Sequence, residues 1–197
     1  MKQIACTAFV LSLAVSAAAQ SAPAPQQPPA RMELSTWLKA QHRTMRLNLT
    51  ESADKMPDDA YGFRPAGVAT EVRTWGQFIG HLSDANNTYC ALARGESPSS
   101  RPQVEKSSAT MSKPDLVKAL ADALAYCDGV YSQLTDTNAL EMIKVPGPND
   151  TTRDVTRVQF LVANLAHNNE HYGNLVTYMR AKGLVPPSTE RAQQPKK

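Results

Sequence analysis

Three histidines have the side chains and the spacing from which a metal site can be built. His167 and His171 stand four residues apart in the run HNNEH, so in a helix both imidazoles project from one face about one turn apart. Such a pair can bind one metal ion. His81 lies near the edge of the apolar stripe of another predicted helix and could reach the same ion. Three neutral imidazoles leave a coordination position open, as a catalytic metal requires.

Glu170 lies inside the same run and could carry a proton, so we predict it as the catalytic residue beside the metal ligands His81, His167 and His171. The alternatives are a carboxylate that simply faces solvent and a histidine pair that decorates the surface. The sequence contains neither H-E-x-x-H nor E-x-x-H, which argues against a zinc-protease helix and a carboxylate-bridged di-iron bundle. For His42 we expect a partly buried, hydrogen-bonded histidine, although it could also line the site.

Four helical patterns must position these residues. We predict helices over 33–55, 74–94, 112–134 and 153–182. Thr74 and Gln77 form a capping box at the start of the second helix. No segment shows a convincing alternation of β-branched residues, so the predicted class is all-α. A four-helix bundle is the simplest way to bury four amphipathic stripes.

The apolar stripes of these helices predict the core. In the last helix they place both histidines to the side of the aliphatic stripe, on a shoulder of the bundle. Trp37 and Trp75 are expected to pack in the core. Polar neighbours could orient the imidazoles or be solvated instead; they are Asp84, Asn164 and Asn168. The predicted stripes of the second and last helices are Trp75, Phe78, Ile79, Leu82, Tyr89 and Ala93, and Val158, Leu161, Val162, Leu165, Val176 and Met179.

The amino terminus predicts export. Residues 1–19 have the basic start, the apolar middle and the A-x-A site of a bacterial signal peptide, with cleavage after Ala19. The mature protein would then be periplasmic or secreted and free of the membrane, with a retained anchor as the alternative. Residues 20–32 are rich in Pro, Ala and Gln and predict a linker. We expect the bundle over 33–187 and a flexible tail over 188–197.

Export leaves two cysteines in an oxidising compartment. Cys6 would leave with the signal peptide, and Cys90 and Cys127 would remain. A disulfide between them and two free buried thiols both fit the sequence.

The composition suits one folded domain and argues against nucleic acid. The 197 residues are 42% hydrophobic, which is enough for a core. The formal net charge is only +3, with 21 Lys and Arg against 18 Asp and Glu. No basic run is longer than Lys196-Lys197, so the chain lacks the positive stripe that tracks phosphates.

Several stretches together resemble the DinB/YfiT-like family of metalloenzymes. They are YGFRP at 61–65, RTWGQFIGHL at 73–82 and HNNEHYGNLV at 167–176, followed by the segment that runs to the two prolines at 186–187. The resemblance covers about residues 33–187. It implies a four-helix bundle in which His81, His167 and His171 hold one divalent metal ion among surface loops.

The resemblance also frames the expected function. Some superfamily members are thiol-dependent transferases or isomerases, but the thiols that they use are cytosolic, so the predicted export argues against thiol transfer here. We expect a metal-dependent enzyme with hydrolase- or transferase-type chemistry on an unidentified small molecule. The metal would be Zn, Ni, Fe or Mn. The alternative is an exported, non-catalytic bundle that binds a metal, a ligand or another protein. Homodimers are common in the family, so a homodimer is also expected.

Overall fold

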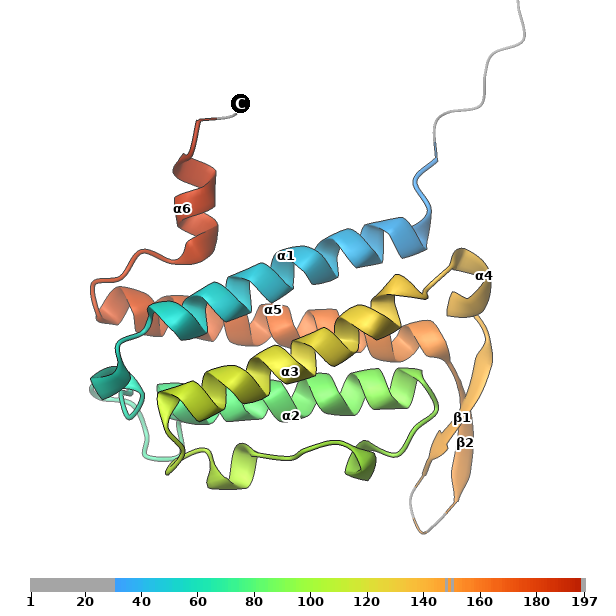
Figure 1. Ribbon diagram of the computed structural model, residues 1–197, viewed down its shortest axis with the longest axis horizontal. Coiled ribbons are helices and arrows are strands. Elements are labelled where there is room, and N and C mark those ends of the chain that lie inside the picture. Colours follow the sequence, from blue (N-terminus) through green and yellow to red (C-terminus); the bar gives the residue numbers. More distant parts are fainter. Residues whose placement is uncertain (1–30, 148, 150, 196–197) are drawn as a thin grey trace, which may run out of the picture. The chain divides into compact units, whose positions relative to one another are not determined.

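The computed structural model describes residues 31–147, 149 and 151–195, and its backbone is mostly helical (Figure 1). The predicted signal peptide and most of the predicted linker lie outside the described residues. Four long helices match the four predicted ones, which confirms the all-α class. They are α1 (Leu34–Lys55), α2 (Trp75–Ala93), α3 (Lys113–Ser132) and α5 (Arg157–Ala181).

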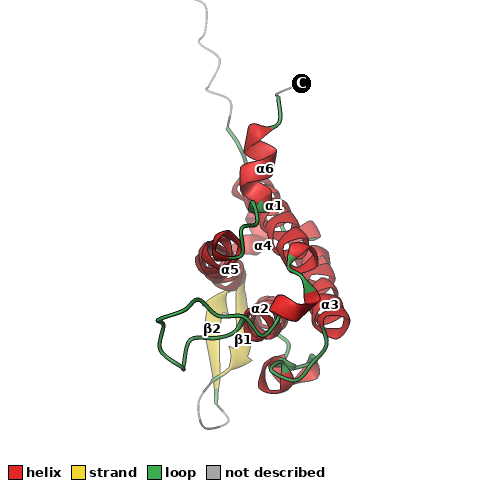
Figure 2. Cartoon of the chain, turned by 90° about the vertical axis from the view of Figure 1, so that its left-hand side faces the viewer, coloured by secondary structure: helices red, strands yellow, loops and turns green. Residues whose placement is uncertain are grey.

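The four long helices form a bundle in which consecutive helices are not always neighbours. α2 packs against α3 and α5, and α1 packs against the same two helices. In the end-on view, α1 and α2 therefore lie opposite one another, with α3 and α5 between them (Figure 2). This arrangement brings α2 and α5 into direct contact, although they are far apart in the sequence.

A long crossover joins α2 to α3. The two helices run in the same direction in Figure 1, so the chain over 94–112 must return along the whole length of the bundle. The crossover contains two short 3-10 helices, η2 (Pro98–Ser100) and η3 (Glu105–Ser107), and both pack against α2. The crossover thus supplies a layer of side chains beside α2 that the helices alone would not provide.

The sequence signals for helix ends are confirmed at α2 and α3. The backbone N–H of Thr74 donates to Gln77 Oε1 at 2.8 Å, and the N–H of Gln77 donates to Thr74 Oγ1 at 3.4 Å, which closes the predicted capping box. The side chain of Ser112 caps α3, whose first turn contains Pro114. Gly95, just beyond α2, has a φ of +75°, a conformation that glycine adopts at little cost.

Buried side chains from all four helices form the core. Trp75 is fully buried, as predicted, in a cluster with residues of α1, α3 and α5. Between α2 and α5 the interior is polar. There Asn86 Oδ1 accepts hydrogen bonds from Asn164 and Asn168, each at 2.9 Å, and all three amides are fully buried. Since buried amides need partners, this network fixes the register of α5 on α2.

A β-hairpin between α3 and α5 corrects the predicted start of the last helix. Strands β1 (Met142–Pro146) and β2 (Thr152–Thr156) pair antiparallel, with Met142 opposite Thr156. The helix predicted from 153 begins only at Arg157, after a short helix α4 (Asp136–Ala139) that precedes the hairpin. Thr152, Val155 and Thr156 are β-branched and favour the strand, whose backbone is satisfied by pairing.

The carboxyl-terminal segment is helical where a flexible tail was expected. Helix α6 (Pro187–Gln193) has proline in its first turn, where a missing N–H costs nothing. It packs on α1 through an ion pair between Glu190 and Lys55, and Arg191 pairs with Glu51 of α1. The segment is polar, so its composition did not predict these contacts with α1. The described part of the segment is therefore docked on the bundle.

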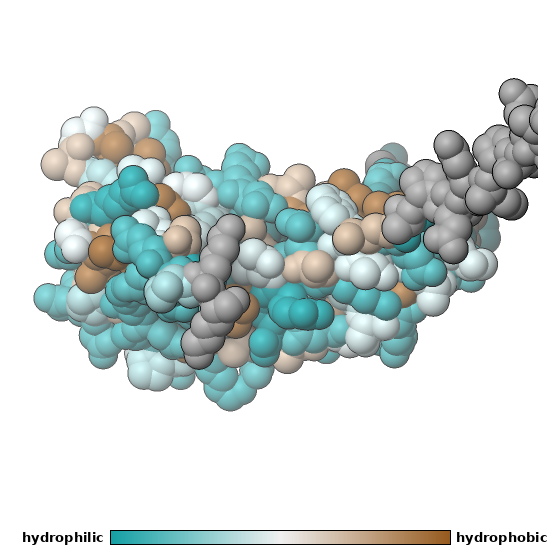
Figure 3. Space-filling model, turned by 90° about the horizontal axis from the view of Figure 1, so that it is seen from above, coloured by the Kyte–Doolittle hydropathy of each residue, from teal (hydrophilic) through white to brown (hydrophobic). Residues whose placement is uncertain are grey.

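Some apolar residues are exposed, contrary to their predicted places in the core. Trp37 is 48% exposed on α1, and Val162 of the predicted aliphatic stripe is 48% exposed on α5. Seen from above, the molecule shows small apolar patches on a mainly hydrophilic surface (Figure 3). The rest of the predicted stripe on α5 is confirmed: Leu161, Leu165 and Met179 are buried, and Val158 and Val176 are partly buried against the core. The same helix also buries Asn164 and Asn168. The expected homodimer stays a prediction.

The two remaining cysteines form a disulfide, which decides between the two alternatives that the sequence left open. Cys90 of α2 and Cys127 of α3 are fully buried, with their Cα atoms 5.4 Å apart. The bond links two parallel neighbours in the bundle.

Within the described residues, no helix is long and apolar enough to span a bilayer.

Candidate metal centre

The three predicted metal ligands converge at one point. His81 Nε2 lies 3.1 Å from the Nε2 atoms of both His167 and His171, and these two lie 3.2 Å apart. His81 comes from the second turn of α2, and the other two come from adjacent turns of α5. The packing of α2 against α5 therefore completes a site of which each helix holds only a part.

The triangle of nitrogens fits a divalent metal ion. Zinc at about 2.0–2.1 Å from three nitrogens in a tetrahedral arrangement separates those nitrogens by about 3.3 Å. The observed separations of 3.1–3.2 Å are close to this value. Within the part of the chain that the structure describes, these three histidines are the one group whose ligand atoms cluster in this way. The residues present thus fit a three-histidine metal site.

Glu105 of the crossover sets the tautomer of His81. Its Oε2 lies 2.9 Å from His81 Nδ1 and, as a carboxylate, accepts the Nδ1–H, which leaves the Nε2 lone pair for a metal ion. Its Oε1 accepts a hydrogen bond from Arg73 Nη2 at 2.7 Å. Partial burial opposes ionisation of Glu105, but the hydrogen bonds from His81 and Arg73 outweigh it and lower the pKa of the carboxyl.

Asp84 holds the backbone that carries Glu105. Its two carboxylate oxygens accept the backbone N–H groups of Val104 at 2.7 Å and of Glu105 at 2.9 Å. The sequence suggested that Asp84 orients an imidazole or is solvated. Instead it is 8% exposed and anchors the crossover to α2, one turn after His81. Asp84 therefore acts on the site through Glu105.

The environment keeps the histidines of α5 neutral at neutral pH. Burial, with the nearby His171 and His81, lowers the pKa of His167 to about 4. Burial and His81 likewise lower the pKa of His171. Neutral imidazole is the form that binds metal ions, so protons compete weakly for these two ligands.

Comparison with known proteins places this site in a family. The family model of the DinB superfamily matches residues 41–175, a stretch that contains all three histidines. The chain belongs to the DinB superfamily. This confirms the resemblance seen in the sequence.

Solved structures show the same fold as this DinB protein at low sequence identity. A DinB-like protein from Bacillus subtilis is 21% identical, with a TM-score of 0.57, over 75% of this chain and 92% of that one. A DinB-like protein from Bacillus cereus is 16% identical, with a TM-score of 0.57, over 79% and 96%. No curated protein matches the chain.

One structural neighbour is a characterised enzyme. The mycothiol-dependent maleylpyruvate isomerase is 12% identical, with a TM-score of 0.56, and the match covers 72% of this DinB protein but only 60% of the isomerase. At this identity the likeness shows the shared fold alone.

Glu170 and His42 lie apart from the three converging nitrogens. Glu170 is exposed on α5, and its charge favours protonation of His171 without overcoming the effect of burial. His42 is 3% exposed, its Nε2 lies 2.9 Å from Asp128 Oδ1, and its ring stacks on Tyr131 at 4.0 Å. This confirms the hydrogen bond expected for His42, whose side chain is more fully buried than the partial burial predicted.

Two other predicted neighbours of the imidazoles have different roles. Asn164 and Asn168 bond to Asn86 in the buried amide network, so they align α5 and α2 and are not solvated. Sequence analysis missed Glu105 altogether. It begins the short 3-10 helix η3, 24 residues after His81, where no periodicity marks it, and only the acidic residue type could have suggested it.

Proposed function

We propose that this DinB protein is a metal-dependent enzyme that uses one divalent ion, held by His81, His167 and His171, for hydrolase- or transferase-type chemistry. The observation that carries the proposal is the convergence of three imidazole nitrogens within 3.2 Å of one another. When bound, a divalent ion with an open position supplies Lewis acidity, which lowers the pKa of water or polarises a carbonyl group.

The protein's own residues would prepare the site in two ways. Glu105 accepts the Nδ1–H of His81 and so aims its Nε2 toward the other two histidines. The ring centroid of Tyr89 lies 5.6 Å from that of His167, and the ring centroid of Phe78 lies 5.5 Å from that of His171. These two rings cover part of the site with apolar surface. Glu170, on the exposed side of α5, is proposed to exchange protons with solvent during turnover.

The zinc, nickel, iron and manganese ions all accept imidazole ligands, so availability would decide which is bound. We propose that residues 1–19 are removed on export and that the protein acts in the periplasm or outside the cell. The small thiols that related enzymes use are cytosolic, so export favours water or another oxygen nucleophile over thiol transfer.

The test is elemental analysis of the purified protein and of the double variant His81→Ala, His167→Ala. We expect about one metal ion per chain in the parent and none in the double variant, with both folded by circular dichroism. His42→Gln is the matched control, because it removes a buried histidine away from the site and should keep the metal. Failure of the parent to hold zinc, nickel or manganese after loading would overturn the proposal.

A measurement of turnover distinguishes a catalytic metal ion from a structural one. An enzyme should lose hydrolysis of activated esters when the metal is removed by dipicolinate, while its circular dichroism stays unchanged. Loss of the fold together with the metal would instead favour a structural ion and the non-catalytic alternative.

A further inference from the structure

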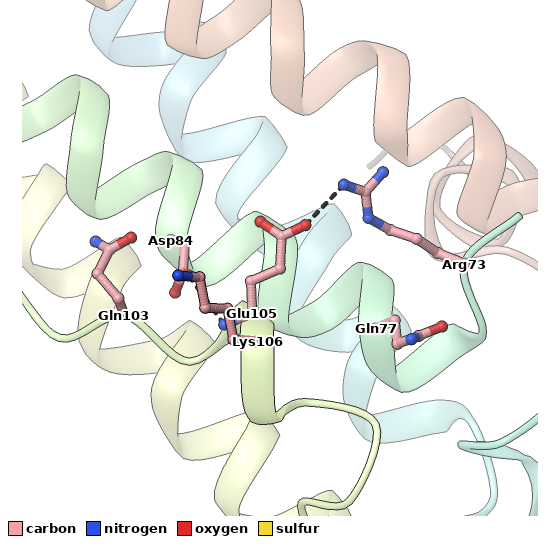
Figure 4. Close-up of a pocket in the computed structure, with 6 residues that line it drawn as sticks. All are labelled: Arg73, Gln77, Asp84, Gln103, Glu105 and Lys106. Carbon is pink, nitrogen blue, oxygen red and sulfur yellow. Dashed lines mark hydrogen bonds and ion pairs between the residues drawn. The ribbon is translucent and has the colours of Figure 1, made fainter. Parts of the chain in front are cut away.

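A cavity of about 680 Å³ lies along α2 beside the metal centre. Figure 4 shows its lining side chains, which come from the loop before α2, from α2 itself and from the crossover. Its volume is in the range of small-molecule sites. The six lining residues all carry polar or charged side chains, so the cavity suits a hydrophilic ligand. They are Arg73, Gln77, Asp84, Gln103, Glu105 and Lys106.

This cavity adjoins the histidines. A second cavity of about 290 Å³ is lined by His81 and His167, and it shares Asp84, Gln103 and Glu105 with the larger one. A small molecule that reaches a metal ion at the histidines can therefore extend into the larger cavity. The side chains that line the larger cavity would then determine which chemical group the substrate carries at its end remote from the metal ion.

Internal hydrogen bonds already satisfy the two carboxylates of the lining. Asp84 accepts two backbone N–H groups of the crossover, and Glu105 accepts from His81 and Arg73. Both carboxylates are occupied by these internal hydrogen bonds. Neither is therefore free to bind a cation or to donate a proton to a ligand. Figure 4 shows Glu105 and Arg73 directed toward one another.

Gln103 can donate and accept through its amide, and the other groups that remain for a ligand are hydrogen-bond donors. Gln77 uses its Oε1 in the capping box, which leaves its amide N–H groups for the cavity. Lys106 contributes an exposed ammonium, and Arg73 has N–H groups beyond the one bonded to Glu105. The formal charges of the lining cancel, so a divalent ion at the histidines would leave the region positive.

We propose that this cavity binds an anionic group of the substrate through Lys106 and Arg73. The substrate would then be a small hydrophilic molecule with a carboxylate remote from the group that reaches the metal. This inference rests on the proposed metal-dependent function and adds the substrate class to it. Charge-assisted hydrogen bonds from an ammonium and a guanidinium supply the selectivity.

The experiment compares two probes with the same four-carbon backbone by isothermal titration calorimetry. Succinate carries two carboxylates, whereas monomethyl succinate carries one and a neutral ester. We expect the zinc-loaded protein to bind succinate about fivefold or more tightly than the ester. Lys106→Gln should remove most of this preference and keep about one zinc ion per chain. Lys118→Gln, which removes an exposed lysine of α3, is the matched control and should change neither.

The outcomes separate this inference from the proposed function. Zinc binding without a preference for succinate, or a preference that Lys106→Gln leaves unchanged, would overturn the anion site and leave the metal centre standing. If the protein holds no zinc, the proposed function fails. The same titration of the metal-free protein then tests the cavity alone: a preference that depends on Lys106 supports the anion site, and none overturns it.

Discussion

Glu105 shows how much a single residue outside the ligand set can control. It accepts hydrogen bonds from His81 Nδ1 at 2.9 Å and from Arg73 Nη2 at 2.7 Å. It therefore fixes the tautomer of His81 and holds the guanidinium of Arg73 at the edge of the cavity. Carboxylates that bond to ligand histidines raise the basicity of the imidazole and limit its rotation. Its contribution should therefore appear in metal affinity rather than in the fold.

We predict that Glu105→Gln weakens zinc binding by about 10- to 100-fold, because the imidazole of His81 loses its charged partner. Competition with a chromogenic chelator measures the affinity. Glu71→Gln, a change of the same kind at an exposed residue, should leave the affinity unchanged. Equal affinities in all three proteins would show that Glu105 has no part in the site.

His42 gives a pH dependence that is independent of the metal site. Burial lowers its pKa below 6.5, and the hydrogen bond and charge of Asp128 offset this effect only in part. Below pH 6.5 the unfolded chain then binds more protons than the folded one. The stability that His42 provides is complete above that pH and is lost as the pH falls toward its folded pKa.

We predict that His42→Gln reduces the loss of unfolding free energy between about pH 7 and about pH 5. Urea titrations of the metal-free parent and variant at both pH values give the two losses, and their difference isolates His42 from the other histidines. A variant that loses as much stability as the parent would contradict the prediction.

At the scale of elements, the crossover between α2 and α3 is the part that completes the site. It carries Glu105 and lies so close to α2 that only glycine fits at position 80. A Cβ built on Gly80 would overlap the side chain of Ser108 and lie 3.5 Å from the Cα of Glu105. The glycine before His81 is therefore a spacing requirement of the crossover, not of the helix.

We predict that Gly80→Ala destabilises the protein and weakens zinc binding, because the crossover must move away from α2 and take Glu105 with it. Chemical denaturation and the chelator competition measure the two effects. In Gly129→Ala the new methyl group meets open space on α3, so helix propensity should stabilise that variant by about 0.5–1 kcal/mol. Stabilisation by both substitutions would contradict the proposed fit.

At the scale of the whole molecule, a metal ion would join two helices that are adjacent in space and distant in sequence. His81 and His167 are 86 residues apart, so the site does not exist in the unfolded chain. An ion that binds the folded chain alone must stabilise it by mass action.

We predict that zinc at about 1,000 times its dissociation constant raises the free energy of unfolding by about 4 kcal/mol. Thermal melts followed by circular dichroism, with and without zinc, measure the change. The His81→Ala, His167→Ala variant should melt at one temperature in both conditions. An equal zinc effect in that variant would place the binding elsewhere on the chain.

The sequence determined the class of the fold and the three histidines that converge, because both depend largely on local chemistry. Helical periodicity and capping residues such as Thr74 act over a few positions, and the i, i+4 spacing of His167 and His171 is a property of one helix. The place of His81 at the edge of its apolar stripe suggested it as the third ligand, and the family pattern implied the same residue. These predictions needed no knowledge of how the helices pack.

Only the tertiary structure decided what surrounds the ligands. The crossover brings Glu105 to His81, buried asparagines align α5 with α2, and α6 docks on α1. The β-hairpin likewise forms because two short segments satisfy each other's backbone. Each of these features depends on partners distant in the chain, and a residue's own neighbours in sequence carry no signal of a contact that only packing creates.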